Sequence, residues 1–496
     1  MDHTNKIIKG SAIVILTNFT LMGLGYLTRL FLARNFSVEE FGLMYGVIAF
    51  INFFQLFYYL GLNNAIVKFV AEFKTKNKKY KIRQTLFTSM ISQFALTLPI
   101  SICIILFRKE LSIYFFKSEL ASLMIIIGSI YLLLSPLGLI KEYFRGLQNM
   151  KLYSLFDIVQ NSFTLIISIL AYYFLNTKLK VNGLILSFAL YYLVLFGIYI
   201  SYLLKEKILS IKLFNLNLSK KMLKFGIPLV LSAVLSMFFG KIDVMLITFF
   251  KGLTEVGYYN VSIPTIGGIF GILGACGLVF FPVVSELLAK NKKKQLIVTT
   301  DRIIKYILIV GFPIMFFIIG NSKEIISILF GNKYKEAFLA MIFYSPMIIL
   351  APLNKIFAPI LMSLNKTKVL AKNSMIVIFI DFIGNVLLIM PYGLVGVVSS
   401  SVIAYLILVV LNATHVKKHI KIKFPFENLS SIMFSSSLFL ILSLFIKGYL
   451  NLSPIFLLLI SGLMSFCIYI VLLFLLKLIS LDELTDIASS FKKKNN

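Results

Sequence analysis

The chain has 496 residues, of which 59% are hydrophobic and 14% are charged, and its formal net charge is +29. One soluble core could not bury this much apolar surface, so the composition excludes an ordinary soluble domain and predicts a polytopic membrane protein. The basic residues lie in short loops between apolar runs, where membrane topology accounts for them, so no nucleic-acid partner is expected.

Fourteen apolar runs recur along the chain, and each is long enough to cross a bilayer as a helix. Strand-like alternation with regular turns is missing, so the predicted fold class is an all-α bundle and not a membrane barrel. The first run continues from the polar start without a small-residue cleavage site and is expected to be a retained span. The predicted spans are 10–33, 41–71, 84–107, 119–140, 153–175, 182–204, 222–250, 255–285, 303–320, 336–362, 370–390, 392–412, 429–449 and 454–479.

The Lys and Arg residues alternate in number from one loop to the next. One side of the membrane receives 34 of them, the other side receives 11, and four lie inside spans. Basic loops face the cytoplasm, so this distribution predicts a cell-membrane protein with both termini and the tail at 480–496 in the cytoplasm. The short loops leave no room for a soluble catalytic domain.

Several segments are repeated about 215 positions apart. Thr254-Glu255-Val256-Gly257-Tyr258-Tyr259 echoes Glu39-Glu40-Phe41-Gly42-Leu43-Met44-Tyr45, and Ser135-Pro136-Leu137 pairs with Ala351-Pro352-Leu353. The repeat predicts two six-helix lobes, at 1–210 and 221–412, and two further helices at 429–479. Because six spans is an even number, the lobes have the same orientation and form a parallel repeat.

Charged residues inside spans are costly and are treated as functional candidates. The basic ones are Arg29, Lys68, Lys241 and Lys355, and Asp243 lies in span seven close to Lys241. The alternative for the basic residues is that their long side chains reach the interface.

Two further acidic residues are candidates for coupling to a proton or a cation. Asp381 lies near the middle of span eleven, with Asn385 one turn further on, and Asp157 lies near the start of span five. The alternative is a structural hydrogen bond to a neighbouring helix.

Catalytic and cofactor motifs are missing from the sequence. It contains no Gly-rich phosphate loop, no nucleophile elbow and no metal triad, and its three cysteines are far apart. We therefore expect a transporter and not an enzyme, with no cofactor, driven by an ion gradient, a substrate gradient or a partner.

The combination of span count, parallel repeat and two turns resembles a known family. The turns are Arg34-Asn35-Phe36-Ser37-Val38-Glu39-Glu40-Phe41-Gly42 and the Val256-Gly257-Tyr258-Tyr259 segment that follows Asp243. They are similar to the polysaccharide-transporter family, the Wzx-like O-antigen flippases of the multidrug/oligosaccharidyl-lipid/polysaccharide exporter superfamily. The resemblance implies a MATE-like fold and alternating access. It also implies a polyprenyl-diphosphate-linked oligosaccharide as substrate, with membrane lipids, H⁺ or Na⁺, and polysaccharide-assembly proteins as candidate partners.

The resemblance also suggests roles for the intramembrane charges. An anionic diphosphate requires cations in a cavity of low dielectric constant. At an offset of 214, Arg29 aligns with Asp243, and an ion pair between them would close the outer side while Lys241 binds phosphate. A cation-coupled multidrug antiporter of the same superfamily and a membrane-embedded glycan polymerase or glycosyltransferase are the alternatives.

Overall fold

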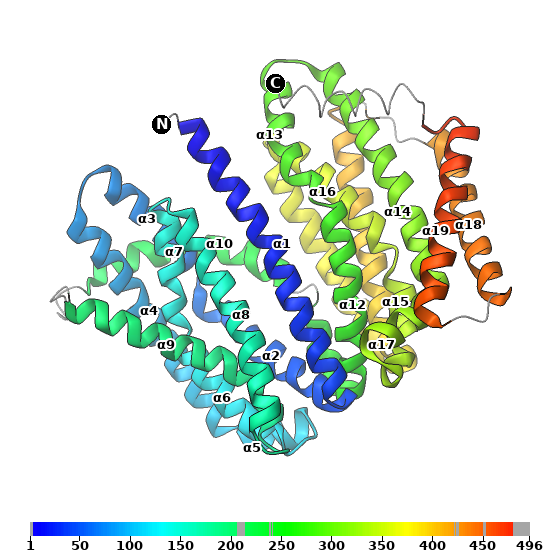
Figure 1. Ribbon diagram of the computed structural model, residues 1–496. Coiled ribbons are helices and arrows are strands. Elements are labelled where there is room, and N and C mark those ends of the chain that lie inside the picture. The colour runs from blue at the N-terminus through cyan, green and yellow to red at the C-terminus, as the bar shows by residue number, and fades with distance from the viewer. Residues whose placement is uncertain are drawn as a thin grey trace. The chain divides into compact units, whose positions relative to one another are not determined.

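The computed structural model describes residues 3–205, 214–237, 240, 242–420, 422, 426–449 and 453–479 (Figure 1). These residues form helices and turns without a strand, which confirms the predicted all-α class. They divide into two compact units, Met1–Asn260 and Val261–Asn496, and the boundary falls within helix α12. The lobes expected at 1–210 and 221–412 stay a prediction.

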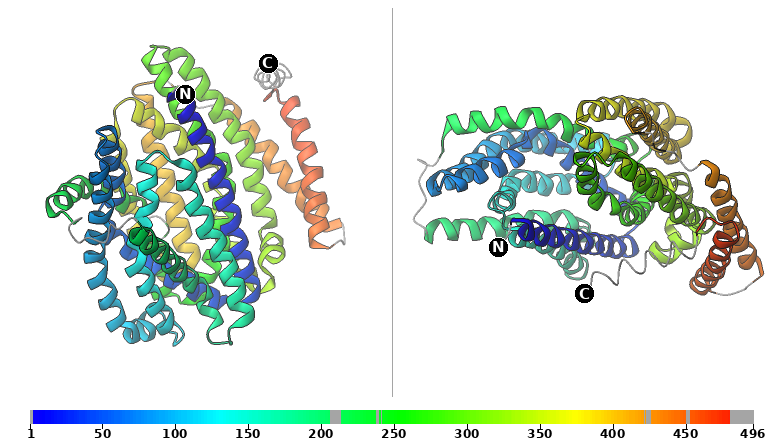
Figure 2. Two further views of the ribbon diagram at one scale, coloured as in Figure 1. Left: turned by 60° about the vertical axis from the view of Figure 1, so that its left-hand side comes forward. Right: turned by 90° about the horizontal axis from the view of Figure 1, so that it is seen from above.

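The first unit is built from long helices and short linking segments. α1 packs along α8, α8 packs against α9, and α4 packs against α6, as the views in Figure 2 also show for α1 and α8. The elements are α1 (His3–Asn35), α2 (Val38–Tyr59), α3 (Leu62–Thr75), α4 (Lys79–Leu106), α5 (Arg108–Glu110), η1 (Leu111–Phe115), α6 (Ala121–Leu134), η2 (Ser135–Gly138), α7 (Leu139–Gly146), α8 (Met150–Phe174), η3 (Lys180–Asn182), α9 (Gly183–Lys205), α10 (Leu216–Met237), α11 (Asp243–Phe250) and the start of α12 (Leu253–Leu273).

The second unit continues from α12, and its last two helices lie at its edge against α14 (Figure 1). Lys447 of α18 donates a hydrogen bond to the Gly320 carbonyl at 3.1 Å and pairs with Glu324 at 2.7 Å. Tyr469 of α19 donates to the Ile309 carbonyl at 2.7 Å. Polar contacts thus attach both helices to α14. The elements are α13 (Cys276–Ala289), α14 (Lys293–Phe330), η6 (Asn332–Ala337), α15 (Phe338–Tyr344), α16 (Met347–Ser363), α17 (Thr367–Lys417), α18 (Phe426–Tyr449) and α19 (Pro454–Leu475).

Five of the predicted spans are not single helices, and one of them, 119–140, divides into α6, η2 and α7. The run 41–71 breaks between α2 and α3, where Leu60 and Gly61 have positive φ values of 35° and 71°. The run 222–250 breaks near Gly240, whose φ is +89°. The runs 255–285 and 336–362 also divide, into α12 and α13 and into η6, α15 and α16. A left-handed residue ends a helix even where the apolar composition continues.

α17 contains two antiparallel helices joined at Gly393, whose φ and ψ are 55° and −135°. Asn373 donates to Asn412 at 2.9 Å, and Ser401 donates to Asp381 at 3.0 Å, so residue pairs on either side of Gly393 face each other. The helix therefore reverses at the boundary predicted between spans 370–390 and 392–412.

Within the described residues, nine helices are long and apolar enough to span a membrane, or ten if one bent pair forms a single span. The breaks in 41–71, 222–250 and 336–362 and the merged α17 account for four of the five spans by which this count falls short of fourteen. The fifth is the predicted span 10–33, which is the unbroken helix α1 and is not among the nine. Fourteen spans stay a prediction, whereas a multi-pass helical architecture is confirmed.

Local geometry repeats at the offset seen in the sequence. Asn77 and Asn291 are left-handed, with φ values of 52° and 53°, and each follows a helix that ends in a Glu–Lys pair. The pairs are Glu72–Lys76 and Glu286–Lys290. The hydrogen bond from the lysine lowers the pKa of each glutamate. The internal repeat therefore extends from sequence to backbone geometry.

Candidate functional site

Asp243 is the first residue of α11 and is only 3% exposed. The Tyr259 hydroxyl donates a hydrogen bond to its Oδ2 at 3.1 Å, which links α11 to α12. The helix N-terminus also favours a carboxylate at this position. Asp243 is thus a buried acidic group held by two elements. Its predicted neighbour Lys241 lies outside the described residues.

Arg29 occupies the equivalent position in α1. Its guanidinium lies 4.9 Å from the centre of the Tyr45 ring, in a cation–π arrangement, and its Nε is buried without a hydrogen-bond partner in the described part of the chain. Among the described contacts, Arg29 makes no ion pair with Asp243, so the predicted pair stays a prediction.

The starts of α2 and α12 touch through glycines. A Cβ on Gly42 would lie 1.9 Å from the Leu253 carbonyl oxygen, and one on Gly257 would lie 2.5 Å from the Val38 carbonyl oxygen. The two contacts are equivalent at an offset of 215, so the repeated sequence segments meet each other. Ser37 and Glu40 form a reciprocal capping box at the start of α2, which fixes where that helix begins.

Lys68 lies on α3 with its ammonium 3.9 Å from the centre of the Phe225 ring of α10. The two helices cross closely here, because a Cβ on either Gly61 or Gly226 would lie 2.3 Å from the opposing backbone. The glycine crossing therefore brings the aromatic ring of α10 to the lysine.

In the second unit, Lys355 of α16 is an exposed residue that packs against two glycines. A Cβ on Gly274 would lie 2.7 Å from the Lys355 Nζ, and one on Gly277 would lie 2.7 Å from the Lys355 carbonyl oxygen. The small residues of predicted span eight thus make room for this lysine.

Asp381 is buried within the α17 hairpin, at 3% exposure. Ser401 donates to its Oδ1 at 3.0 Å, and Ser400 donates to its backbone carbonyl at 3.1 Å. Asn385 is buried one turn further on. Sequence reasoning singled out Asp381 but missed the serines, which come from the opposite arm of the hairpin.

A chain of three asparagines, of which Asn354 is next to Lys355 in sequence, was also missed. Asn412 donates to Asn354 at 2.8 Å and accepts from Asn373 at 2.9 Å. This network ties α16 to both arms of α17, because the Asn412 amide donates through its nitrogen and accepts through its oxygen.

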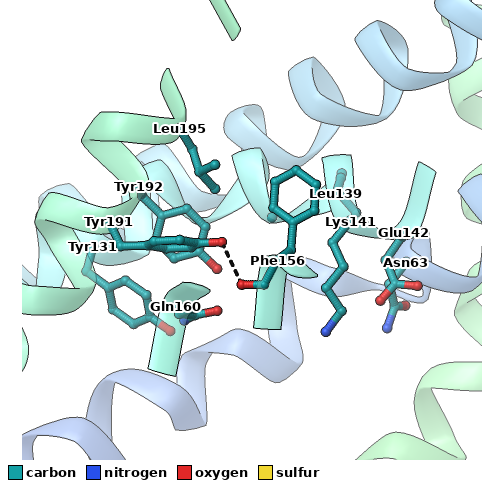
Figure 3. A pocket seen from close by; sticks show the side chains of 11 residues that line it. Asn63, Tyr131, Leu139, Lys141, Glu142, Phe156, Gln160, Tyr191, Tyr192 and Leu195 are labelled. Atoms are coloured by element: carbon teal, nitrogen blue, oxygen red, sulfur yellow. Dashed lines mark hydrogen bonds between the residues drawn. The ribbon is translucent and has the colours of Figure 1, made fainter. Parts of the chain in front are cut away.

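Asp157 of α8 accepts a hydrogen bond from the Lys141 ammonium of α7 at 2.7 Å. Beside this pair is a polar cavity of about 240 Å³ (Figure 3). The cavity lies between α3, α6, α7, α8 and α9, and its polar lining includes Asn63, Tyr131, Lys141, Glu142, Gln160, Tyr191 and Tyr192. Lys141 and Glu142 were not predicted as site residues, because the sequence places them at a loop boundary.

The site residues therefore fall in two groups. Arg29, Lys68, Asp157 and Asp243 belong to the first unit, whereas Lys355 and Asp381 belong to the second. Within the described residues there is no cluster of three or more His, Cys, Asp or Glu side chains that could hold a metal ion.

Comparison with known proteins places the chain in a family. The model of the family described as "Polysaccharide biosynthesis protein" matches residues 7–288, and the MatE family model matches residues 228–395. An uncharacterized membrane protein of Methanocaldococcus jannaschii is 25% identical over 512 aligned residues, with 100% of each chain covered. A probable low-salt glycan biosynthesis flippase of Haloferax volcanii is 27% identical over 209 residues, which cover 42% of this chain and 44% of that protein.

Two solved structures establish the fold. The lipid II flippase MurJ, in an inward closed conformation, matches with a TM-score of 0.74 and 19% identity over 92% of this chain and 97% of that chain. An inward-facing multidrug resistance MATE family transporter matches with a TM-score of 0.59 and 15% identity over 81% and 94%. The fold is thus MATE-like, as the sequence resemblance implied. The model of the family described as "Polysaccharide biosynthesis protein" covers more than half of the chain. The protein therefore belongs to this family, a multi-pass membrane family of the multidrug/oligosaccharidyl-lipid/polysaccharide exporter superfamily.

Proposed function

We propose that the protein is a flippase that moves a polyprenyl-diphosphate-linked oligosaccharide from the cytoplasmic to the outer leaflet of the cell membrane. The setting of its intramembrane cations carries this proposal. Arg29 and Lys68 lie against aromatic rings, Lys355 lies against glycines, and none has a salt bridge to a carboxylate in the described part of the chain. Such cations attract an anionic headgroup strongly in a low-dielectric setting.

The outer side of the transport path closes where the two sequence repeats meet. Arg29 contacts Tyr45, one turn after Gly42, and Asp243 contacts Tyr259, two residues after Gly257. Opposite charges thus flank the glycine contact. In this proposal Arg29, Lys241 and Asp243 regulate its opening, and both termini lie in the cytoplasm, as the loop charges favour.

Asp381 is the coupling site that the contacts support best. Its carboxylate is buried and accepts a hydrogen bond from a neutral serine, which leaves it able to bind H⁺ or Na⁺. Asp157 is the second candidate, although its carboxylate already contacts the Lys141 ammonium.

A flipping assay tests the proposal. Liposomes would carry fluorescent polyprenyl-diphosphate-linked N-acetylglucosamine in both leaflets, and dithionite would quench the outer leaflet. We expect the purified protein to expose the protected inner pool to quenching, whereas protein-free liposomes retain it. Lys68→Gln and Lys355→Gln should slow exposure, while Lys109→Gln, at an exposed residue of α5, should match the wild type. Wild-type liposomes that protect as much lipid as empty ones would refute the proposal.

A cation-coupled multidrug antiporter is the second candidate, because the MatE family model matches residues 228–395. It predicts uptake of a cationic dye such as ethidium into proteoliposomes in exchange for H⁺ or Na⁺. Dye exchange without movement of the lipid-linked sugar would favour this function over the flippase.

A further inference from the structure

The cavity of the first unit has a composition that differs from the cation sites described above. Its volume of about 240 Å³ is below the range of about 300–1,000 Å³ typical of drug-sized ligands, so it suits a small ligand such as one sugar ring. It is partly open, so a ligand attached to a longer chain can enter it.

The charges around the cavity are balanced. Lys141 pairs with Asp157 at 2.7 Å, and Arg145 pairs with Glu142 at 3.0 Å. A site for a diphosphate would need excess positive charge. A site for a lone cation would need a free carboxylate, whereas the Asp157 carboxylate here is already paired with the Lys141 ammonium. The balance therefore favours an uncharged polar ligand.

The polar groups lie at two ends of the cavity (Figure 3). Tyr131, Tyr191, Tyr192 and Gln160 lie at one end, and Lys141, Glu142 and Asn63 lie at the other, with the Phe156 ring between them. Phenol and amide groups both donate and accept hydrogen bonds, and carboxylates accept them. The Tyr191 hydroxyl already donates to the Phe156 carbonyl at 3.1 Å, so it faces a ligand as an acceptor (Figure 3). This combination complements the hydroxyl groups of a sugar, and the aromatic rings offer apolar surface to its C–H faces.

We infer that this cavity binds one sugar unit of the transported lipid, an inference that rests on the proposed function. Lys141 and Glu142 begin the segment 141–152, which the loop charges place at the cytoplasmic side. The cavity thus lies where a glycan assembled in the cytoplasm would first meet the protein. The diphosphate headgroup then binds the intramembrane cations, so different residues recognise the headgroup and the sugar.

Two binding experiments on the purified full chain test this inference. The first measures, by saturation-transfer NMR and calorimetry, the binding of methyl glycosides of glucose, galactose, mannose and N-acetylglucosamine. The second measures the binding of farnesyl diphosphate, which carries the headgroup without a sugar. Gln160→Leu removes an amide from the cavity, and Asn161→Leu makes the same kind of change at the next residue of α8, which does not line it.

We expect at least one glycoside to bind, about tenfold more weakly to Gln160→Leu than to the wild type or Asn161→Leu, because a hydrogen-bonding partner is lost. Farnesyl diphosphate should bind all three proteins equally. A lower thermal unfolding midpoint would reveal that Gln160→Leu does not fold properly. In that case Tyr131→Phe replaces it in the experiment, because this variant removes a cavity hydroxyl while retaining the ring.

The outcomes separate this inference from the proposed function. If no glycoside binds, or if glycoside binding is unaffected by Gln160→Leu and Tyr131→Phe, the sugar site is refuted, and normal flipping in the liposome assay would leave the flippase proposal standing. If a glycoside binds in the expected manner but the wild type moves no lipid-linked sugar, the cavity assignment is supported and the flippase proposal fails.

Discussion

Two tyrosines close to the glycine contact of the repeat hold residues of opposite charge. Tyr45 contacts Arg29, and Tyr259 bonds to Asp243, and both pairs are related by an offset of 214 residues. Tyr45 lies three residues after Gly42 and Tyr259 lies two residues after Gly257, so the tyrosines are offset by one position when the glycines are aligned. The contacts also differ in kind, because Arg29 lies over the Tyr45 ring whereas the Tyr259 hydroxyl donates a hydrogen bond to Asp243. Such a pair of opposite charges is suited to a contact that forms and breaks during transport.

Replacing Tyr259 by Phe removes the hydroxyl that donates to Asp243. A buried acceptor that loses a donor costs about 1–3 kcal/mol, so we expect a lower thermal unfolding midpoint in detergent and slower flipping. Tyr173→Phe is the matched control, because that side chain is 69% exposed. Equal unfolding midpoints and flipping rates in both variants would show that the bond has no such role.

Sequence reasoning predicted individual buried charges more successfully than their partners. Asp243 and Asp381 were identified because a carboxylate inside an apolar run is conspicuous, and both are buried. The Lys141–Asp157 pair and the Asp381–Ser401 bond were missed, since each joins residues 16 or 20 positions apart on different helices. Only the packing of these helices brings such residues together.

Helices in the first unit cross at glycines where a side chain would strike backbone. Gly42 and Gly257 do so between α2 and α12, and Gly61 and Gly226 do so between α3 and α10. Where two helix backbones approach closely, their carbonyl and Cα groups pack directly against each other, as at other helix interfaces in membranes. The breaks between α2 and α3 and near Gly240 were not predicted, because the apolar runs continue through them and a backbone angle leaves no mark on hydropathy.

Gly42→Ala should open the contact between α2 and α12. Its new Cβ would lie 1.9 Å from a backbone oxygen, whereas a Cβ on Gly46, one turn on, meets only ordinary contacts at 3.4 Å or more. Overpacking of this kind costs about 1–3 kcal/mol.

The measurement uses a single cysteine at the fully buried Val256, with Cys103, Cys276 and Cys467 replaced by Ser. We expect a water-soluble maleimide to react faster in Gly42→Ala than in Gly46→Ala. Equal rates would mean that the glycine contact does not keep this end of the unit closed.

At the second crossing, Gly226→Ala should lower the free energy of unfolding by about 1–3 kcal/mol. Gly197→Ala in α9 meets nothing within 4 Å and should raise it by about 0.5–1 kcal/mol, because alanine favours a helix over glycine. One series of thermal unfolding scans can compare the signs of these two changes in stability. A stabilising effect of both substitutions would contradict the close crossing.

At the scale of the whole molecule, the internal repeat is the feature that sequence and structure share most fully. The turns at Asn77 and Asn291 have the same left-handed residue and the same Glu–Lys pair, and Gln148 and Asn365 share a left-handed φ of 59°. An odd number of spans between equivalent turns would place them on opposite sides of the membrane. A parallel repeat requires an even number, so these turns test the topology even where single spans are broken.

Accessibility of single cysteines to a membrane-impermeant maleimide decides this topology. Lys78→Cys and Lys292→Cys, at exposed sites in equivalent turns, should be protected in intact cells and react after the cells are opened. Glu119→Cys, exposed at the outer end of the predicted span 119–140, and Lys333→Cys, exposed in a turn predicted to face outward, should react in intact cells. Labelling of position 78 and position 292 from opposite sides would refute the parallel repeat. Labelling of both from outside would preserve the repeat and reverse the orientation, which would place the sugar cavity at the wrong face for loading from the cytoplasm.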